Sequence, residues 1–529
     1  MLKINNIKVP LIFSEQDIKN HLSHTMRVKP SQIDGVEILK RSVDCRDKGD
    51  IKYVLSVAVR LLDEDKYLKY NPKAEASRYT KPPTDIEYLL DGVRVLPRQR
   101  PVVVGSGPAG MFCALTLALA GAKPIVLERG QSALERTASV DKFWKSGQLD
   151  TSSNIQFGEG GAGTFSDGKL NTGIGSDKIN IVLSEFVKAG APSEILWQSK
   201  PHIGTDILVD CVQNIRKRII ELGGEYRFQH TLVDVKKNMG QLTAVVVDSP
   251  QGRYEIDTDV CVLAIGHSAR DTFEMLAGKV AIEQKAFSMG VRVEHLQSDI
   301  NKAQYGKDIP ILGASDYKLA THLDNGRSCY TFCMCPGGYV IPATSEEGCV
   351  VTNGMSYHAR DGVNANSALL VGVGPEDFHS DSVLAGVELQ RKYERAAYNV
   401  SHSYKAPCQM VGDLMADKAS SKLGKVQPTY QLGVELCDMR SCLPGYVVES
   451  LRLAIKAFDR KIKGFADDES ILTGVESRSS SPIRILRDER GNSSIQGLIP
   501  CGEGAGYAGG ITSACVDGIT MALKAIRQL

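Results

Sequence analysis

The sequence predicts an α/β protein in which a Rossmann-type domain follows a small α+β module. Three clusters of glycines, at residues 105–110, 158–163 and 502–510, together outline one cleft for an elongated cofactor. The first cluster has a strand pattern before it and a helix pattern after it. At 529 residues, the chain is long enough for two or three domains with sizeable cores.

Residues 1–97 form the predicted α+β module. Ser14 has the side chain of a helix N-cap, and the helix that follows would bury Ile18, Leu22 and Met26. Residues 51–61 alternate in the pattern of a half-buried antiparallel strand, and a linker near Pro97 ends the module. The module also carries a local basic cluster, which indicates a solvated face or a docking site: Arg41, Arg46 and Lys48.

The first glycine cluster lies in a predicted βαβ unit. Apolar residues 101–104 predict a buried parallel strand, and residues 108–120 predict the helix after it. A second strand, 124–127, ends at Glu128, and 128 minus 105 places this carboxylate 23 positions after Gly105. Glycines let the backbone approach a pyrophosphate, and a carboxylate at this spacing accepts hydrogen bonds from ribose hydroxyls. The cofactor that we expect is FAD.

The second cluster lies in residues 153–169, a long polar and glycine-rich stretch with neither regular period. A loop of this length without secondary structure is unfavourable in a compact domain unless a ligand or other contacts order it. Its consecutive N–H groups, with the Thr164 hydroxyl and the Lys169 cation, could wrap the pyrophosphate and the edge of the flavin ring. A flexible surface loop is the alternative.

The third cluster joins a predicted strand, 497–501, to a predicted helix, 511–526. Glu503 is placed to accept hydrogen bonds from the ribityl hydroxyls of FAD. Gly509 and Gly510 would let the start of the last helix approach the pyrimidine end of the flavin. The positive end of that helix would stabilise the negative charge of reduced flavin.

Two further segments are predicted to lie beside the same cofactor. Residues 228–235 read as one strand, with backbone groups near Val233 at the adenine, and residues 259–266 read as a buried strand that ends in Gly266. The predicted FAD-binding residues are Gly105, Gly107, Pro108, Ala109, Gly110, Glu128, Arg129, Gly160, Gly161, Gly163, Thr164, Lys169, Val233, Gly266, Gly502, Glu503, Gly509, Gly510 and Ile511.

Composition excludes several classes of protein. The net charge is +1 and no long basic run occurs, so a nucleic-acid partner has no electrostatic support. The 13 cysteines are irregularly spaced and the first ten residues lack the apolar core of a secretion signal, so we expect a reducing cytoplasm. No run of about 18 apolar residues predicts a transmembrane segment.

Taken together, the motifs resemble the uncharacterised FAD-dependent dehydrogenases of bacteria and plastids. The motifs that carry the resemblance are residues 102–110, 126–130, 157–170, 332–338, 474–484 and 502–510. The resemblance covers essentially the whole chain and implies a FAD-binding domain of the glutathione-reductase type, with an inserted second domain. It leaves the substrate open.

The resemblance and the patterns together predict four segments. These are an N-terminal α+β module at 1–97, two parts of the FAD-binding domain at 98–285 and 464–529, and an inserted β-rich substrate or cap domain at 286–463. Within the insert, residues 287–294 and 348–352 predict strands and residues 383–397 predict a helix. We expect the resulting sheet to cover the isoalloxazine ring, where a small-molecule substrate would enter.

Four side chains are catalytic candidates. Cys333 and Cys335 could relay electrons, but one intervening residue is strained for a disulfide, so structural cysteines are favoured. Arg478 could hold an anionic substrate or form an ion pair within the fold. His267 could donate a proton, although capping or loop hydrogen bonding is the commoner use of a histidine in such a place.

The sequence therefore predicts a FAD-dependent oxidoreductase that transfers a hydride or an electron pair between flavin and a small substrate. A second complete dinucleotide fingerprint is missing, so electrons would come from NAD(P)H docking transiently, from a carrier protein, or from the substrate. One alternative is a saturase or desaturase of a lipid-like C=C bond, which predicts an apolar tunnel in the insert. Another is a flavin-binding sensor or assembly protein that works through the N-terminal module.

Overall fold

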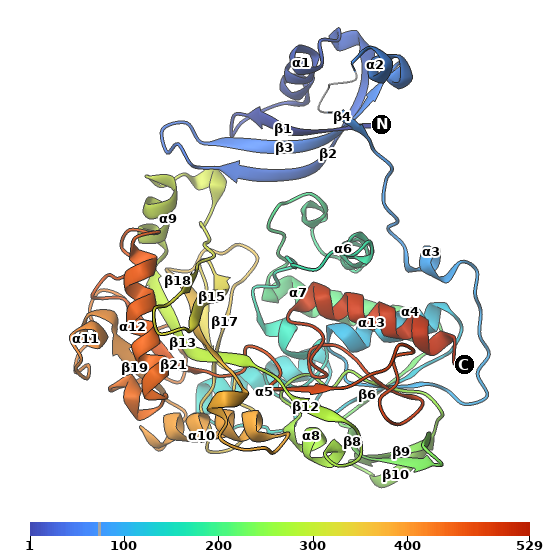
Figure 1. The fold of residues 1–529 in the computed structure, drawn as a ribbon, viewed down its shortest axis with the longest axis vertical. Coiled ribbons are helices and arrows are strands. Elements are labelled where there is room, and N and C mark those ends of the chain that lie inside the picture. Colours follow the sequence, from blue (N-terminus) through green and yellow to red (C-terminus); the bar gives the residue numbers. More distant parts are fainter. Residues whose placement is uncertain (72–75) are drawn as a thin grey trace.

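The structure is a computed structural model that describes residues 1–71 and 76–529 (Figure 1). In the N-terminal module, a four-stranded sheet in the order β2-β3-β1-β4 carries two helices on one face. The elements are β1 Leu2–Val9, α1 Glu15–Met26, β2 Ile33–Asp44, β3 Lys52–Leu61, α2 Glu64–Tyr70 and β4 Ala76–Arg78. The predicted N-cap is confirmed, because the Ser14 hydroxyl accepts a hydrogen bond from the Asp17 amide at 3.2 Å.

The basic cluster of the module makes contacts within the chain. The Arg41 guanidinium lies 4.4 Å from the Trp197 ring centroid, and the backbone amide of Arg41 donates to the Trp197 carbonyl at 2.8 Å. The Lys48 ammonium donates to the Ala303 carbonyl at 2.8 Å, whereas Arg46 pairs with its neighbour Asp44. Arg41 and Lys48 therefore attach the module to the rest of the protein.

A parallel five-stranded sheet forms the centre of the next domain. Its order is β7-β6-β5-β11-β23, so the strands lie in the order third, second, first, fourth and fifth along the chain. The strands are β5 Val102–Val104, β6 Ile125–Glu128, β7 Glu225–Phe228, β11 Cys261–Leu263 and β23 Leu498–Pro500. The predicted βαβ unit is confirmed, and helix α4, Pro108–Leu119, begins within the first glycine cluster.

One predicted strand is wrong. Residues 228–235 are not continuous, because β7 ends at Phe228 and β8 begins at Thr231. Between them Gln229 adopts the left-handed φ of 62°, which turns the chain out of the parallel sheet. Strand β8, Thr231–Asn238, instead belongs to a separate antiparallel sheet with β9 Gln241–Ser249 and β10 Gly252–Asp257.

Helices cover the parallel sheet. Helix α4 is buried on all sides except at Pro108, and helix α13, Ile511–Ile526, packs along it (Figure 1). This explains why α4 is apolar all round rather than amphipathic. The other helices of this region are α3 Ile86–Leu90, α5 Ala133–Ser146, α6 Lys178–Lys188, α7 Thr205–Glu221 and α8 Arg270–Leu276.

A second large sheet has seven strands in the order β14-β15-β18-β13-β21-β19-β20. They are β13 Phe287–Leu296, β14 Ala320–His322, β15 Ser328–Cys335, β18 Asn364–Val373, β19 Ala406–Met410, β20 Val434–Leu436 and β21 Ile471–Glu476. The strand predicted at 287–294 is confirmed. The one predicted at 348–352 is wrong, because Gly348 has a left-handed φ of 67° and strand β17, Thr352–Met355, begins only at Thr352.

Helices and short sheets complete this region. The helix predicted at 383–397 is confirmed as α10, Ala385–Asn399. The other elements are α9 Gln297–Tyr305, α11 Val411–Met415, α12 Gly445–Asp459, β12 Ile282–Gln284, β16 Tyr339–Pro342 and β22 Ile483–Ile485. Strand β21 of the large sheet lies beyond residue 463, and the predicted division into four segments stays a prediction. In the described part of the chain, every helix is too short or too polar to traverse a bilayer.

Candidate functional site

One cleft runs from the ends of the parallel strands to the seven-stranded sheet. Its empty space, including the open mouth, is about 1520 Å³. The glycine loops line one end, and side chains from β15, β17 and the end of β21 line the other. The lining residues at this second end are Phe332, Cys333, Cys335, Asn353, Gly354, Glu476, Arg478 and Ser479.

The cleft brings together most of the residues predicted to bind FAD. Those that line it are Gly105, Gly107, Pro108, Ala109, Glu128, Arg129, Gly161, Gly163, Lys169, Gly266, Glu503, Gly509, Gly510 and Ile511. Residues 106–108 and 161–163 therefore face a common space with residues 509–511, which lie more than three hundred positions further along the chain. Their individual roles in binding FAD stay predictions.

Five of the predicted residues lie outside the lining: Gly110, Gly160, Thr164, Val233 and Gly502. The three glycines among these five residues allow close packing of the chain. A Cβ on Gly110 would lie 1.9 Å from the Gly105 carbonyl oxygen. A Cβ on Gly160 would lie 2.0 Å from the Thr164 hydroxyl, and one on Gly502 would lie 2.6 Å from the Ala109 Cβ. These three glycines therefore pack against the cleft-lining loops on the side away from the cleft.

The glycine end of the cleft fits a pyrophosphate. Gly107 precedes helix α4 and Gly510 precedes helix α13, and among the described residues neither helix start has a side-chain cap. A Cβ on Gly161 would lie 2.9 Å from the Gly107 Cα, so the two loops touch through glycines. The buried Ser106 hydroxyl at the same turn has no partner within the described chain. Free N–H groups, a helix dipole and an unpaired hydroxyl are the donors that an anionic dinucleotide needs.

Glu128 ties the loops of this end together. Its carboxylate accepts hydrogen bonds from the amides of Ser106 at 2.9 Å, Gly130 at 2.9 Å and Gly158 at 3.0 Å. These amides belong to the first glycine turn, the end of β6 and the second glycine loop. The side chain also lines the cleft, so a carboxylate oxygen can still face a ribose, as predicted.

Arg136, on helix α5, is a residue that the sequence reasoning missed. It is fully buried, and its guanidinium donates to the carbonyls of Asn154, Ile155 and Glu159 at 2.8 Å each and of Gly161 at 2.9 Å. A longer bond of 3.4 Å reaches the Gly158 carbonyl. The Arg136 side chain therefore orders the loop of the second glycine cluster. This is the long loop that, according to the sequence, needs additional contacts to be ordered.

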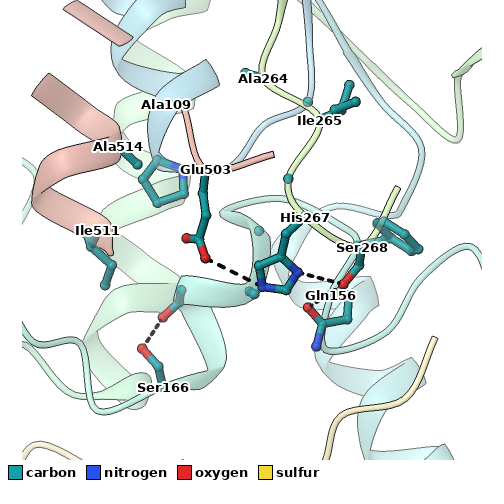
Figure 2. A pocket seen from close by; sticks show the side chains of 18 of the residues that line it. Ala109, Gln156, Ser166, Ala264, Ile265, His267, Ser268, Glu503, Ile511 and Ala514 are labelled. Atoms are coloured by element: carbon teal, nitrogen blue, oxygen red, sulfur yellow. Dashed lines mark hydrogen bonds and ion pairs between the residues drawn. The ribbon is translucent and has the colours of Figure 1, made fainter. Parts of the chain in front are cut away.

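Glu503 and His267 face each other across the middle of the cleft (Figure 2). A Glu503 Oε1 atom lies 3.7 Å from His267 Nε2. Burial raises the pKa of Glu503 to about 7, although Lys285 favours its ionised form. Burial also lowers the pKa of His267 to about 3, and Arg478 adds to this shift. The imidazole is therefore neutral at physiological pH.

The hydrogen bonds around Ser268 define the tautomer of that imidazole. The Ser268 hydroxyl donates to the Gln156 side-chain oxygen at 3.1 Å and accepts from Arg478 Nη1 at 3.2 Å. His267 Nδ1 lies 3.0 Å from the same hydroxyl (Figure 2). Since the single hydroxyl proton is already used, Nδ1 must donate, and the unprotonated Nε2 faces Glu503.

Arg478 forms the ion pair that the sequence left as one of two alternatives. Its Nη2 and Nε atoms donate to the fully buried Glu394 at 2.8 Å and 3.0 Å. Glu394 also accepts from Arg270 on helix α8, at 2.7 Å and 2.8 Å. One carboxylate on α10 thus binds two arginines from different parts of the chain. Arg478 still lines the cleft, so a contact with substrate stays a prediction.

The far end of the cleft is built around Arg292 on strand β13, which is fully buried. The guanidinium donates to Glu476 at 2.9 Å, to the Asn353 side chain at 2.9 Å and to the Cys333 carbonyl at 2.8 Å. Burial raises the pKa of Glu476 despite this partner. Lys169 reaches the same end, where it pairs with Asp167 at 2.7 Å.

Comparison with known proteins agrees with this cleft. Residues 100–156 match the family model of an FAD binding domain, and residues 286–479 match that of an FAD-dependent protein, C-terminal domain-like. Residues 1–60 match a domain of unknown function. The cleft and the two matching family models define a FAD-dependent protein, with FAD as its cofactor.

The particular family follows from a full-length relative. A protein of Clostridium beijerinckii, described as uncharacterized, is 48% identical over 533 residues, which is 100% of this chain and 99% of that protein. The chain belongs to the same family as that protein.

Two solved structures show a weaker likeness. A geranylgeranyl bacteriochlorophyll reductase-like protein of Thermoplasma acidophilum is 11% identical at a TM-score of 0.35, covering 81% of this chain and 77% of that one. The glycerol-3-phosphate dehydrogenase of Bacillus halodurans is 11% identical at a TM-score of 0.35, covering 82% and 65%.

Proposed function

We propose that this protein transfers a hydride or an electron pair between FAD and a small polar substrate bound under the seven-stranded sheet. The observation that carries the proposal is the continuity of the cleft, which leads from the glycine loops directly to Cys333, Asn353 and Glu476. A cofactor along the loops and a substrate at these side chains would share one enclosed space. When bound there, FAD supplies a reversible two-electron acceptor.

The residues proposed to hold FAD act through distinct groups. The Gly107 amide and the Ser106 hydroxyl would bind the pyrophosphate, with the second glycine loop packed beside them. Glu128 would accept from the ribose, and the start of α13 at Gly510 would face the pyrimidine end. The strand order of the parallel sheet, with the seven-stranded sheet inserted between β11 and β23, supports the glutathione-reductase-type arrangement that we propose.

The character of the far end favours a polar substrate over the lipid-like alternative. Lys169, Asn353 and Glu476 line it, whereas a saturase or desaturase would need an apolar tunnel there. NAD(P)H docking transiently remains our proposed source of electrons. A carrier protein at the N-terminal module is the proposed partner if neither nicotinamide reduces the flavin.

Anaerobic mixing of the purified, FAD-loaded protein with NADH and with NADPH tests this proposal. We expect rapid bleaching of the flavin absorption band with at least one of them. Dithionite, which reduces accessible flavin without specific binding, serves as the positive control. Bleaching by dithionite alone would overturn the NAD(P)H proposal, and a protein that neither retains nor rebinds FAD would overturn the proposed function altogether.

A further inference from the structure

Cys333 differs from the cysteines near it, because its side chain is exposed to the cleft. Its neighbours Met334 and Cys335 are buried, at 3% and 1% exposure. The thiol faces the same end of the cleft as Asn353 and Glu476, where we propose that the substrate binds. The Cys333 thiol is therefore exposed to the cleft and not to the outer surface of the protein.

A bulge in strand β15 produces this orientation. Phe332 pairs with Ala368 of strand β18, but the next pair is Cys335 with Asn366, so β15 contains one residue more than its partner. Cys333 lies in the bulge with a left-handed φ of 40°, which residues other than glycine seldom adopt. The extra residue takes its side chain out of the alternation of the sheet and turns it into the cleft. Such conformations persist only where surrounding contacts hold them.

Three contacts hold the bulge. Arg292 Nη1 donates to the Cys333 carbonyl at 2.8 Å, and the Cys335 thiol donates to the same carbonyl at 3.2 Å. Lys169 donates to the Met334 carbonyl. Arg292 is itself fixed by Glu476 and by two asparagines. The backbone on both sides of the thiol is therefore fixed, while the thiol makes no hydrogen bond to any of the described residues.

The same surroundings keep the thiol protonated. Although the Cys333 thiol borders the cleft, the protein that surrounds it excludes enough water to raise its pKa to about 12, against the nearby Arg292, which favours the thiolate. At neutral pH the group is S–H, a proton donor, rather than the thiolate that acts as a nucleophile. The Cys335 thiol is already used in holding the bulge, which separates its role from that of Cys333.

We propose that Cys333 is the substrate-side proton donor of the reaction, an inference that rests on the proposed function. In the reductive direction, reduced FAD held in the cleft would supply a hydride, with its electron pair, to one atom of the substrate. The S–H bond of Cys333 breaks, and its proton bonds to the substrate atom adjacent to the one that receives the hydride. The substrate thereby gains two electrons and two hydrogens, both electrons coming from the flavin, and the Cys333 thiolate regains a proton from water. The substrate class is a molecule with a polarised double bond.

Alkylation of the FAD-loaded protein tests this placement without the natural substrate. N-ethylmaleimide is applied between pH 7 and pH 10, the modified peptides are identified by mass spectrometry, and the flavin spectrum is recorded. We expect modification of Cys333 but not of Cys335, with a rate that rises about tenfold per pH unit and does not level off, because only the thiolate reacts. The flavin band should shift while FAD stays bound, since the adduct would form beside the ring.

Two variants make the test specific. Cys333→Ser should abolish the spectral shift and keep its FAD, whereas Cys335→Ser should retain both the modification and the shift. The inference is overturned if Cys333 is not modified while FAD is bound, if its rate levels off near pH 8, or if its modification expels FAD. Failure of the proposed function has a different signature, since the protein would then bind no FAD at all.

Discussion

Replacing Arg136 by methionine should open the second glycine loop and weaken FAD binding. The change removes the guanidinium but keeps a side chain of similar length in the core. Four carbonyls at 2.8–2.9 Å would lose the Arg136 donor, and among the described residues only the Glu159 carbonyl keeps another side-chain donor, the Thr164 hydroxyl at 3.3 Å. A buried polar group without a partner costs about 1–3 kcal/mol, so the closed loop loses about 3 kcal/mol for the other three carbonyls. Because 1.4 kcal/mol corresponds to a tenfold change, FAD affinity should fall roughly a hundredfold.

Two measurements check this reasoning. The dissociation constant of FAD from the apoprotein follows from flavin fluorescence, and hydrogen exchange reports the protection of the amides in residues 153–163. Lys142→Met provides the matched control, since Lys142 lies on the same helix and is exposed. Arg136→Lys should give an intermediate loss, because an ammonium has three donors and cannot reach the same set of carbonyls. If Arg136→Met binds FAD within threefold of wild type with unchanged protection, the account of the loop is wrong.

Three further predictions concern charged groups of the site. The folded-state pKa of Glu503 is raised to about 7, so its contribution to stability is present below pH 4.5 and is lost as the pH rises through 7. The Tm of the wild type should therefore fall more between pH 5 and pH 8 than that of Glu503→Gln, and parallel curves would contradict this. Glu128→Ala should lower both the Tm and FAD affinity, because three amides lose their acceptor, while Glu128→Gln should lose less; an unchanged FAD dissociation constant would refute it. Glu394→Gln should cost about 3–5 kcal/mol in urea unfolding, since the buried Arg478 loses its counter-charge and Arg270 keeps only Glu346 among the described acidic residues, whereas Glu388→Gln at the surface should change little.

Local patterns were enough to predict the glycine end of the cleft. The βαβ unit, the carboxylate at Glu128 and helix α13 each follow from short stretches of sequence with a definite period. The sequence predicts one strand at 228–235 because strand-forming residues lie on both sides of Gln229, where a left-handed φ interrupts the strand. Such a backbone turn at a residue other than glycine or proline leaves little trace in the sequence.

The far end of the cleft could be predicted only in part. Cys333 and Arg478 were candidates, but their surroundings depend on Arg292, Glu394 and Glu476, which long-range strand and helix packing brings together. The role of Arg136 could not be predicted, because its partners are backbone carbonyls 18 to 25 residues further along the chain. Every residue has a backbone carbonyl, so the sequence does not indicate which carbonyls accept a hydrogen bond. Non-local pairing is therefore what separates the predicted site from the observed one.

The order of the parallel sheet has a consequence for how the protein matures. Strand β11 begins at Cys261 and its neighbour β23 begins at Leu498, 237 residues later by subtraction. The third glycine loop and α13 therefore leave the ribosome after the whole seven-stranded sheet has been synthesised. Until then the nascent chain has the first two glycine loops but not the wall that closes the cleft over them. Capture of the cofactor should thus be a late event in biogenesis, and a chain stalled before β23 should be a poor acceptor of FAD.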